Sequence, residues 1–507
     1  MIKLKINKKW YLCATAGIVA VALLFVKVDN GQQNKRYEQH LSQPSELELG
    51  EKPDSKGLVT HLPIISIDTD GQKIPGKAII GKNNSEVGVE KGENGEENII
   101  AKMKTMEKEG QWHQETDEAD IESDILIHIR GNSSRTFDKS SYRIELVKEK
   151  NPELKNKQPL LGMKKSSSWA LYGPYLDKTL IRNYMWMNIS GRIMGYAPNV
   201  RFCELMLDGE YQGVYVLMEI IEMSEERLNL FPYTPGDPVM SYVVCIDSPS
   251  KIERTVDSFS FYTKRLEQRK RYEIVYPGVK EQTQQVKDYI SMDISEIEHA
   301  IYSYDTSNDP GFYLKYLDEN SFVDYYILQE FLGNIDTYKA STYFYKDIRG
   351  KLQIGPVWDY NNVLNNFFQS QSAERFLLTD RGFYSQLMKS SRFVNQVIRR
   401  YRELRKSWLS EEYLLSYIDE TEEWLGSAID RNFEVWGYTF DWTKMKPYAR
   451  RIPDLGETNE SVNPSSYAEA NESMKEYLVT RGRWMDQHIE SLKQYCHESK
   501  NVNTALY

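Results

Sequence analysis

Residues 334–361, with the sequence NIDTYKASTYFYKDIRGKLQIGPVWDYN, predict a hairpin that has an acidic residue at each end. One strand is expected over 341–346 and the returning strand over 351–357. Asp336 enters this hairpin and Asp359 leaves it, and paired strands lie only about 4.8 Å apart. We therefore expect the two carboxylates to be near neighbours in space, although they are well separated along the chain.

Two acids at strand ends beside a cleft suit a hard divalent cation together with a general base. The pair also matches the layout used for phosphoryl transfer, in which one Asp positions a hydroxyl and another holds Mg²⁺. The spacing alone supports a purely structural alternative equally well. In that alternative Asp336 caps a turn and Asp359 ends a strand.

A second strand pair is expected earlier in the chain, where isoleucines alternate over 125–130 and apolar residues alternate over 142–146. The small residues between these strands could place backbone N–H groups against phosphates, and nearby cations could pair with a polyphosphate. Small-residue turns are common, however, and lone basic residues on strands usually face solvent. The candidates for phosphate contact in this region are Arg130, Gly131, Ser133, Ser134, Lys139 and Arg143.

The remaining patterns complete the expected fold. A helix over 178–194 carries Arg182, whose role is ambiguous, and Asp208-Gly209 predicts a tight hairpin turn. Residues 321–333 predict another helix, and residues 376–495 show mostly helical patterning. Strands first and helices last indicate an α+β, two-lobed body with a mostly helical C-terminal portion.

The first 30 residues differ from this body. Four lysines precede an uncharged, mostly apolar run over 10–26, which is just long enough to cross a bilayer as a helix. No small-residue cleavage pattern follows it, so a transmembrane signal anchor is favoured over a cleaved signal peptide. The positive charges then predict a single-pass cell-membrane protein with the bulk of the chain extracytoplasmic.

The organisation expected from these patterns has six parts. They are a cytoplasmic basic segment (1–9), the membrane anchor (10–26), a disordered linker (27–57), a β-rich part (58–122), the core (123–375) and a helical C-terminal part of the same domain (376–507).

Composition narrows the possible partners. The chain has 507 residues and a formal net charge of −10, which argues against nucleic-acid binding, because that needs clustered Lys and Arg. Its four cysteines are too few for a disulfide framework, and no Cys or His pair has the spacing of a zinc site. The Cys and His residues therefore predict no transition-metal site of their own.

Taken together, these motifs resemble the CotH kinase family, the spore-coat protein H group of atypical, secretory-type protein kinases. The resemblance covers about residues 62–495. It rests on Arg130-Gly131-Asn132-Ser133-Ser134 with Lys139, Tyr142 and Arg143; on Asp177-Lys178, Leu180 and Arg182-Asn183; on Asp208 to Tyr215 with Glu219; and on Asn334, Asp336, Tyr343 to Asp347 and Gly355 to Asp359.

The resemblance implies a protein-kinase-like fold that binds ATP with Mg²⁺ or Mn²⁺ and phosphorylates Ser or Thr of surface or spore-coat-type proteins. It makes Asp336 similar to the catalytic-loop Asp and Asp359 similar to the metal-binding Asp. Either Lys139 or Arg143 would face the phosphates. Glu219 is a further candidate for the nucleotide pocket.

Two positions depart from the pattern implied by the resemblance. Ser341 stands where a second metal-binding Asn is usual, and Asn361 stands where many relatives have Asp. Both can offer an oxygen to a cation, and these departures predict one bound metal ion rather than two. Two alternatives therefore stay open, a non-catalytic scaffold of the same family and a hydrolase that acts on surface glycans.

Overall fold

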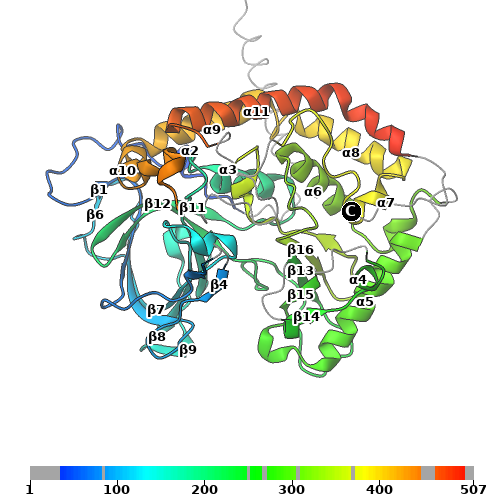
Figure 1. Cartoon of the computed structure of the whole chain (residues 1–507), viewed down its shortest axis with the longest axis horizontal. Coiled ribbons are helices and arrows are strands. Elements are labelled where there is room, and N and C mark those ends of the chain that lie inside the picture. The colour runs from blue at the N-terminus through cyan, green and yellow to red at the C-terminus, as the bar shows by residue number, and fades with distance from the viewer. Residues whose placement is uncertain are drawn as a thin grey trace, which may run out of the picture. The chain divides into compact units, whose positions relative to one another are not determined.

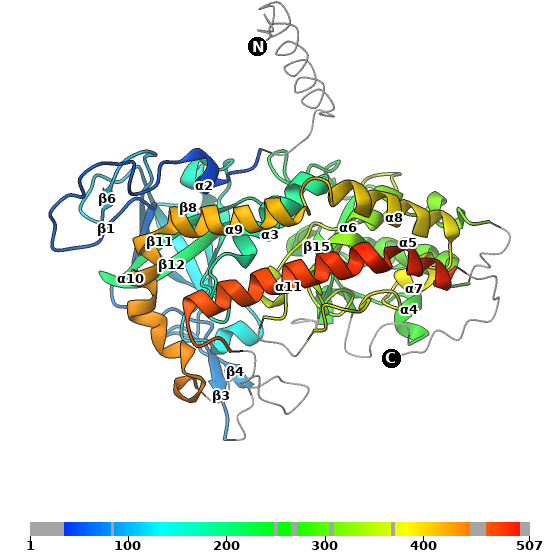
Figure 2. The ribbon, with the colours of Figure 1, turned by 90° about the horizontal axis from the view of Figure 1, so that it is seen from above.

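The computed structural model describes residues 35–82, 86–247, 252–264, 271–303, 309–366, 371–446 and 463–496. The chain divides into two units, 1–35 and 36–507, and the fold below is that of the second unit. Its two main sheets and the helices that pack on them are shown in Figures 1 and 2.

Seven strands of the first sheet close into a ring. The strand order is β10-β12-β11-β2-β5-β7-β8-β9, and β10 pairs with β8 as well as with β12. Only β2 and β11 pair in parallel; the other neighbours are antiparallel. The strands are β2 (Ile64–Asp68), β5 (Ile99–Met106), β7 (Ile121–Ile129), β8 (Tyr142–Lys148), β9 (Asn151–Lys155), β10 (Ser168–Tyr172), β11 (Val200–Leu207) and β12 (Glu210–Glu219).

Side-chain alternation explains how the ring is filled. In β7 every second residue is buried, and its isoleucines join a separate core cluster with Ile144, Trp169 and Leu217 from neighbouring strands. β11 and β12 are joined by the expected tight turn, where Asp208 and Gly209 both have positive φ.

A smaller sheet lies on the other side of the unit, with the strand order β14-β15-β13-β16-β17. Helices α5 and α6 pack with this sheet, and α6 ends at Gly333, whose φ of 63° is the left-handed conformation that glycine favours. The predicted hairpin of residues 341–357 forms β16 and β17. The strands are β13 (Tyr242–Asp247), β14 (Thr255–Val256), β15 (Arg271–Tyr276), β16 (Thr342–Lys346) and β17 (Gln353–Ile354).

Helices connect the two sheets. Figure 1 shows α9 and α11 along the top of the molecule, and Figure 2 shows them extending from the first sheet toward α8. The helices are α2 (Gln39–Ser42), α3 (Arg182–Ile193), α4 (Phe259–Tyr262), α5 (Gln284–Ser303), α6 (Glu319–Leu332), α7 (Tyr384–Leu387), α8 (Ser391–Leu404), α9 (Glu411–Leu425), α10 (Ser427–Trp436) and α11 (Tyr467–His488). Short strand pairs form between β1 (Val59–Thr60) and β6 (His113–Gln114), and between β3 (Ala78–Ile80) and β4 (Glu86–Val89).

The predicted fold class, an α+β, two-lobed kinase-like fold with a mostly helical C-terminal portion behind a transmembrane helix, is wrong. The first sheet is a closed ring of mixed strands, because Trp169 of β10 pairs with Ile144 on one side and Glu219 on the other. Periodicity shows which face of a strand is buried, but it does not show whether a sheet has a free edge. In the described part of the chain every helix is too short or too polar to span a bilayer, and residues 10–26 lie outside that part.

Part of the segment assigned to a linker is packed against the fold. Arg36 is buried, and its guanidinium donates to the carbonyl oxygens of Met187, Ala197 and Pro198 at 2.8–2.9 Å. These bonds hold the start of the second unit against the end of α3.

One buried ion pair ties α11 to α6. Arg481 and Glu330 are both fully buried, and Glu330 also accepts hydrogen bonds from the backbone N–H groups of Leu377 and Leu378 at 2.8 and 2.9 Å. Removing one member of such a pair leaves the other charge buried without its partner, which is more costly than the loss of an exposed pair.

We therefore predict that Arg481→Met lowers the free energy of unfolding by about 3 kcal/mol, measured by urea denaturation. Arg483→Met is the matched control, because Arg483 lies two residues away on α11 and pairs with Glu411 in solvent. The control should change stability by less than about 1 kcal/mol. Equal effects of the two substitutions would contradict this account of the α6–α11 contact.

Candidate functional site

Three carboxylates gather at one edge of the second sheet. Asp247 ends β13, Asp336 lies in the turn after α6, and Asp359 follows β17. The strand registers pair Ile246 with Thr342 and Phe344 with Ile354, so the three segments reach the same edge. Asp336 and Asp247 both raise the pKa of Asp359, which means that their charges act on it.

The backbone at Asp359 is unusual. Its φ of 63° and ψ of 64° lie in the left-handed region, which Asp tolerates better than most residues but at some cost in energy. The following residue is fixed by α3, because the Tyr360 N–H donates to Asn183 Oδ1 at 2.9 Å. The Tyr360 hydroxyl accepts a bond from Gln329 of α6 at 3.0 Å. Two helices therefore hold the strained segment in place.

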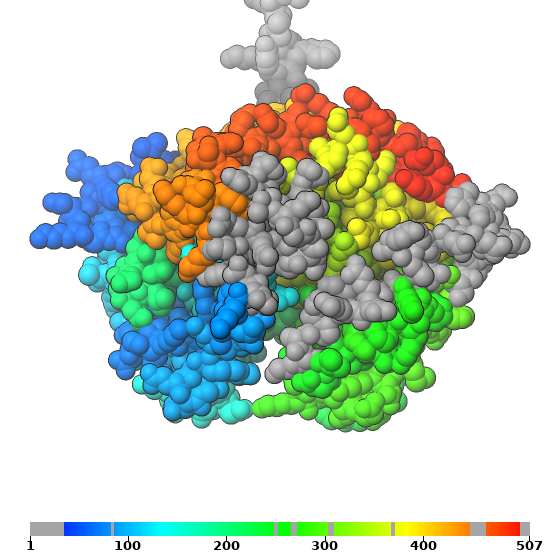
Figure 3. All heavy atoms as spheres, in the orientation of Figure 1, coloured from blue at the N-terminus to red at the C-terminus, as the bar shows by residue number. Residues whose placement is uncertain are grey.

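A cation from the first sheet faces these carboxylates. Arg130 directly follows β7, and its guanidinium lies 5.1 Å from the ring centre of Trp358. Burial lowers the pKa of Arg130, while the charge of Asp359 raises it. In Figure 3 the surface is hollowed between the strands of the first sheet and the β14–α5 region, and we call this hollow the cleft. Arg130 follows β7 of the first sheet, and Asp359 follows β17 of the second sheet.

The environment of Asp359 changes its acidity. Asp359 is an exposed residue, but nearby protein atoms desolvate its carboxylate, and this desolvation raises its pKa from 3.8 to about 6. Arg130 acts against the increase, and Asp336 and Asp247 add to it. Arg130 offsets part of this cluster of like charges, and a bound cation would offset it further.

Arg143 lies beside Arg130 on the neighbouring strand. Burial lowers the pKa of Arg143 to about 10, and the next largest cause is the like charge of Arg130. Glu145 and Glu222 are near enough to oppose this shift, but no described residue accepts a hydrogen bond from the Arg143 guanidinium. The two guanidinium groups together form a positive surface at the start of the small-residue loop.

That loop turns sharply after Arg130. Gly131 has a φ of 120°, and a Cβ there would lie 1.8 Å from Ser134 Oγ, so the turn requires glycine. Residues Ser133–Thr136 form one turn of 3₁₀ helix, in which Ser133 is exposed and Ser134 is partly buried.

Three of the predicted site residues are bound by internal partners. Lys139 is buried, with its ammonium 2.7 Å from Val214 O and 2.6 Å from Asn432 Oδ1. Arg182 forms a buried ion pair with Asp177 at 2.6 Å. It also donates to Val363 O at 3.2 Å, so it supports the segment after Asp359.

Glu219 is the third predicted site residue that has internal partners. It lies buried at the end of β12 and accepts a bond from the Asn199 N–H at 2.8 Å. Burial raises the pKa of Glu219, and the charge of Arg227 opposes the increase.

The two positions that depart from the family pattern have different surroundings. The Ser341 N–H donates to Asp247 Oδ2 at 3.3 Å, which joins this position to the third carboxylate. Asn361 Oδ1 is buried and has no hydrogen-bond partner among the described residues, so it is an oxygen suited to a cation. Within the described residues, no three His, Cys, Asp or Glu side chains are grouped closely enough to hold a metal ion.

Sequence reasoning missed Asp247 and assigned no site role to Trp358. Asp247 follows the apolar run from Tyr242 to Ile246, so it carries the same signal, an acid at a strand end, that identified Asp359. Its distance along the chain hid its pairing with the hairpin. No local pattern could show that Trp358 would lie against Arg130.

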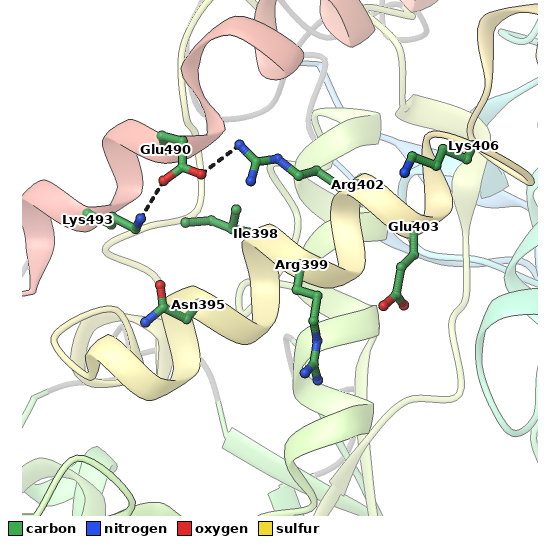
Figure 4. Close-up of a pocket in the computed structure, with 8 residues that line it drawn as sticks. All are labelled: Asn395, Ile398, Arg399, Arg402, Glu403, Lys406, Glu490 and Lys493. Atoms are coloured by element: carbon green, nitrogen blue, oxygen red, sulfur yellow. Dashed lines mark ion pairs between the residues drawn. The ribbon is translucent and has the colours of Figure 1, made fainter.

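A separate polar hollow lies between α8 and the 3₁₀ helix Ile489–Tyr495 (Figure 4). Glu490 pairs there with Arg402 and with Lys493, both at 2.6 Å, so opposite charges are largely satisfied. None of the residues that line it belongs to the carboxylate cluster.

Comparison with known protein families agrees with the pattern of motifs. The family described as CotH kinase protein matches residues 127–485, which is more than half of the chain and includes Arg130, Asp247, Asp336 and Asp359. A search of curated proteins finds no match. The chain belongs to the CotH kinase family.

Proposed function

We propose that this protein is a metal-dependent phosphotransferase that moves the γ-phosphoryl group of ATP to Ser or Thr hydroxyls of a protein substrate. The observation that carries the proposal is the placement of Asp359, with Asp336 and Asp247 beside it, opposite Arg130 in the cleft. Membership of the CotH kinase family supports the same reaction class.

The residues present fit a hard divalent cation, Mg²⁺ or Mn²⁺. Asp359 is a crowded, partly desolvated carboxylate, and Asn361 has a buried oxygen that no described residue binds. These are the oxygen donors that such ions prefer, and a bound ion would neutralise charge on the transferred phosphoryl group. Asp359 and Asn361 would hold it, and Ser341 is the third candidate ligand.

The chain's own residues then divide the remaining work. Arg130 and Arg143 offer guanidinium groups that can bind phosphate oxygens in a forked geometry. Asp336 is partly exposed at the same edge, where it can accept a hydrogen bond from the acceptor hydroxyl and orient it for attack. The loop that begins at Gly131 would cover the phosphates.

A non-catalytic scaffold of the same family is the second candidate. Ser341 and Asn361 favour it, because both are weaker ligands than the residues that many relatives have there. The Asn361 side chain is also engaged through its amide, which donates to Asn362 at 3.0 Å. The scaffold predicts nucleotide binding at most, with no transfer.

Substitution of the two acids separates these possibilities. We expect Asp359→Asn to lose metal-dependent ATP binding, because it removes the charged ligand. We expect Asp336→Asn to keep the parent's affinity for Mn²⁺ with ATP but to lose phosphoryl transfer, because Asp336 acts on the hydroxyl. Calorimetric titration and a phosphorylation assay measure the two effects, and two variants that behave like the parent would refute the assignment.

Substitution of Arg143 provides a second test, which concerns the binding of the ATP phosphates. Arg143→Met should weaken ATP binding by about tenfold or more, because a charge-assisted hydrogen bond is lost. Arg399→Met is the control, because Arg399 lies on the exposed face of α8, in the polar hollow (Figure 4). Unchanged ATP affinity in Arg143→Met would remove Arg143 from the site.

The acidity of Asp359 predicts a pH dependence of stability. Because its pKa is about 6 when folded and 3.8 otherwise, the folded chain binds the extra proton between these values. Its charge therefore opposes folding above about pH 6 and has no effect below about pH 4.

Asp359→Asn should accordingly stabilise the metal-free protein above pH 6, by about 1 kcal/mol once solvent screening is allowed for, and should leave stability unchanged below pH 4. Denaturation at pH 7.5 and pH 4 measures the difference. Asp380→Asn, at an exposed position, is the control and should have no effect at either pH. A loss of stability in Asp359→Asn at pH 7.5 would contradict the electrostatic account.

A further inference from the structure

The loop after Arg130 is held in place by residues some 300 positions later in the chain. We use the name C-terminal clamp for residues 432–446, which comprise the end of α10 and the two short 3₁₀ turns after it. Their contacts with residues 137–139 involve hydrogen bonds, an ion pair and aromatic packing.

The first contact joins α10 to Lys139. Asn432 Oδ1 accepts from the Lys139 ammonium at 2.6 Å and from the Val214 N–H at 3.1 Å. The ammonium also lies 5.1 Å from the Tyr215 ring centre and 6.0 Å from that of Trp436. Lys139 is 1% exposed, so these groups replace its water and fix the end of the loop.

The second contact holds Asp138. The Tyr438 hydroxyl donates to Asp138 Oδ2 at 2.8 Å, and Lys446 forms an ion pair with the other carboxylate oxygen. Both partners belong to the C-terminal clamp. The two oxygens of Asp138 are thus bound from outside the loop.

The third contact is apolar. Phe137 stacks on Tyr175 with ring centres 5.2 Å apart, and both rings join a small core cluster with Trp442 and Met445. Four hydrogen bonds within residues 131–137 shape the turn of the loop, but none of them joins it to another element. Its position relative to the first sheet is therefore set by outside contacts, which are those of the C-terminal clamp together with Lys77, whose ammonium donates to Phe137 O.

The C-terminal clamp is itself anchored to the first sheet. Arg431 of α10 forms an ion pair with the buried Glu204 of β11 at 2.9 Å, and Trp436 donates to Gln212 O at 2.8 Å. A continuous chain of contacts therefore connects β11 and β12 to α10, and α10 to the loop that begins directly after Arg130.

From these contacts we propose that the C-terminal clamp sets the position of loop 131–138 and of Arg130 opposite Asp359, with Tyr438 and Asn432 as positioning residues for the phosphates of the nucleotide. The inference rests on the proposed function, because it names what orders the phosphate side of that site. Neither residue touches the reacting atoms in this account.

The test uses the full chain and the double substitution Tyr438→Phe with Lys446→Met, which frees Asp138 without opening the apolar cluster. Amide hydrogen exchange of residues 131–138 should become faster, while exchange in β13 and β16 stays the same. The Kd for ATP with Mn²⁺ should rise roughly three- to tenfold, the value of one or two lost hydrogen bonds. The KM for ATP should rise with it and kcat should not, because Asp336 lies on the other side of the cleft.

Tyr262→Phe is the matched control, because it also removes a tyrosine–aspartate hydrogen bond of 2.8 Å, to Asp257, far along the chain from the clamp. It should change neither quantity. If amide exchange of residues 131–138 is unchanged in the double variant, the proposed role of the C-terminal clamp is wrong, whether or not the Kd for ATP changes. If the parent itself binds no ATP, the proposed function fails, and faster exchange of 131–138 in the double variant would still establish the clamp.

Discussion

The opposition of Arg130 to three carboxylates across the cleft is the constraint on which the rest of the structure depends. Asp247, Asp336 and Asp359 repel one another at the edge of the second sheet, and desolvation makes the charge of Asp359 more costly still. The arrangement persists because rigid elements hold both sides. α3 fixes the segment after Asp359, and the first sheet fixes Arg130.

The support of this cleft comes from residues that are far apart in sequence. Arg182 and Asn183 at the start of α3 bind the backbone at Val363 and Tyr360. The C-terminal helices contact both halves of the fold. Arg431 of α10 pairs with Glu204 of β11, and Arg481 of α11 pairs with Glu330 of α6. A site on rigid elements of this kind keeps its geometry without a ligand, and preorganisation of that kind favours phosphoryl transfer.

Local patterns predicted the local structure well. The alternation of isoleucines gave β7, Asp208-Gly209 gave the β11–β12 turn, and the hairpin after Asp336 is present as β16 and β17. The closure of the first sheet could not be predicted, because it depends on β10, a short strand without a clear alternating pattern that pairs on both sides. Closure is a property of pairing between distant segments.

Pairing between distant segments also explains why only part of the candidate site could be predicted. Strand-end acids could be recognised for Asp336 and Asp359, but nothing near Asp247 in sequence shows that β13 pairs with β16. Sequence also shows that Lys139, Arg143 and Arg182 are basic without showing their partners. The structure gives Lys139 and Arg182 internal acceptors and leaves the guanidinium of Arg143 without one among the described residues.

The central claim is that this cleft transfers phosphoryl groups. The most direct test is mass spectrometry of a degenerate Ser/Thr peptide library incubated with the full chain, Mn²⁺ and ATP whose γ-phosphate carries ¹⁸O. The account predicts peptides that carry the labelled phosphate on Ser or Thr with the parent and none with Asp336→Asn. Absence of labelled peptides with the parent, in Mn²⁺ and in Mg²⁺, or equal labelling by the variant, would contradict it.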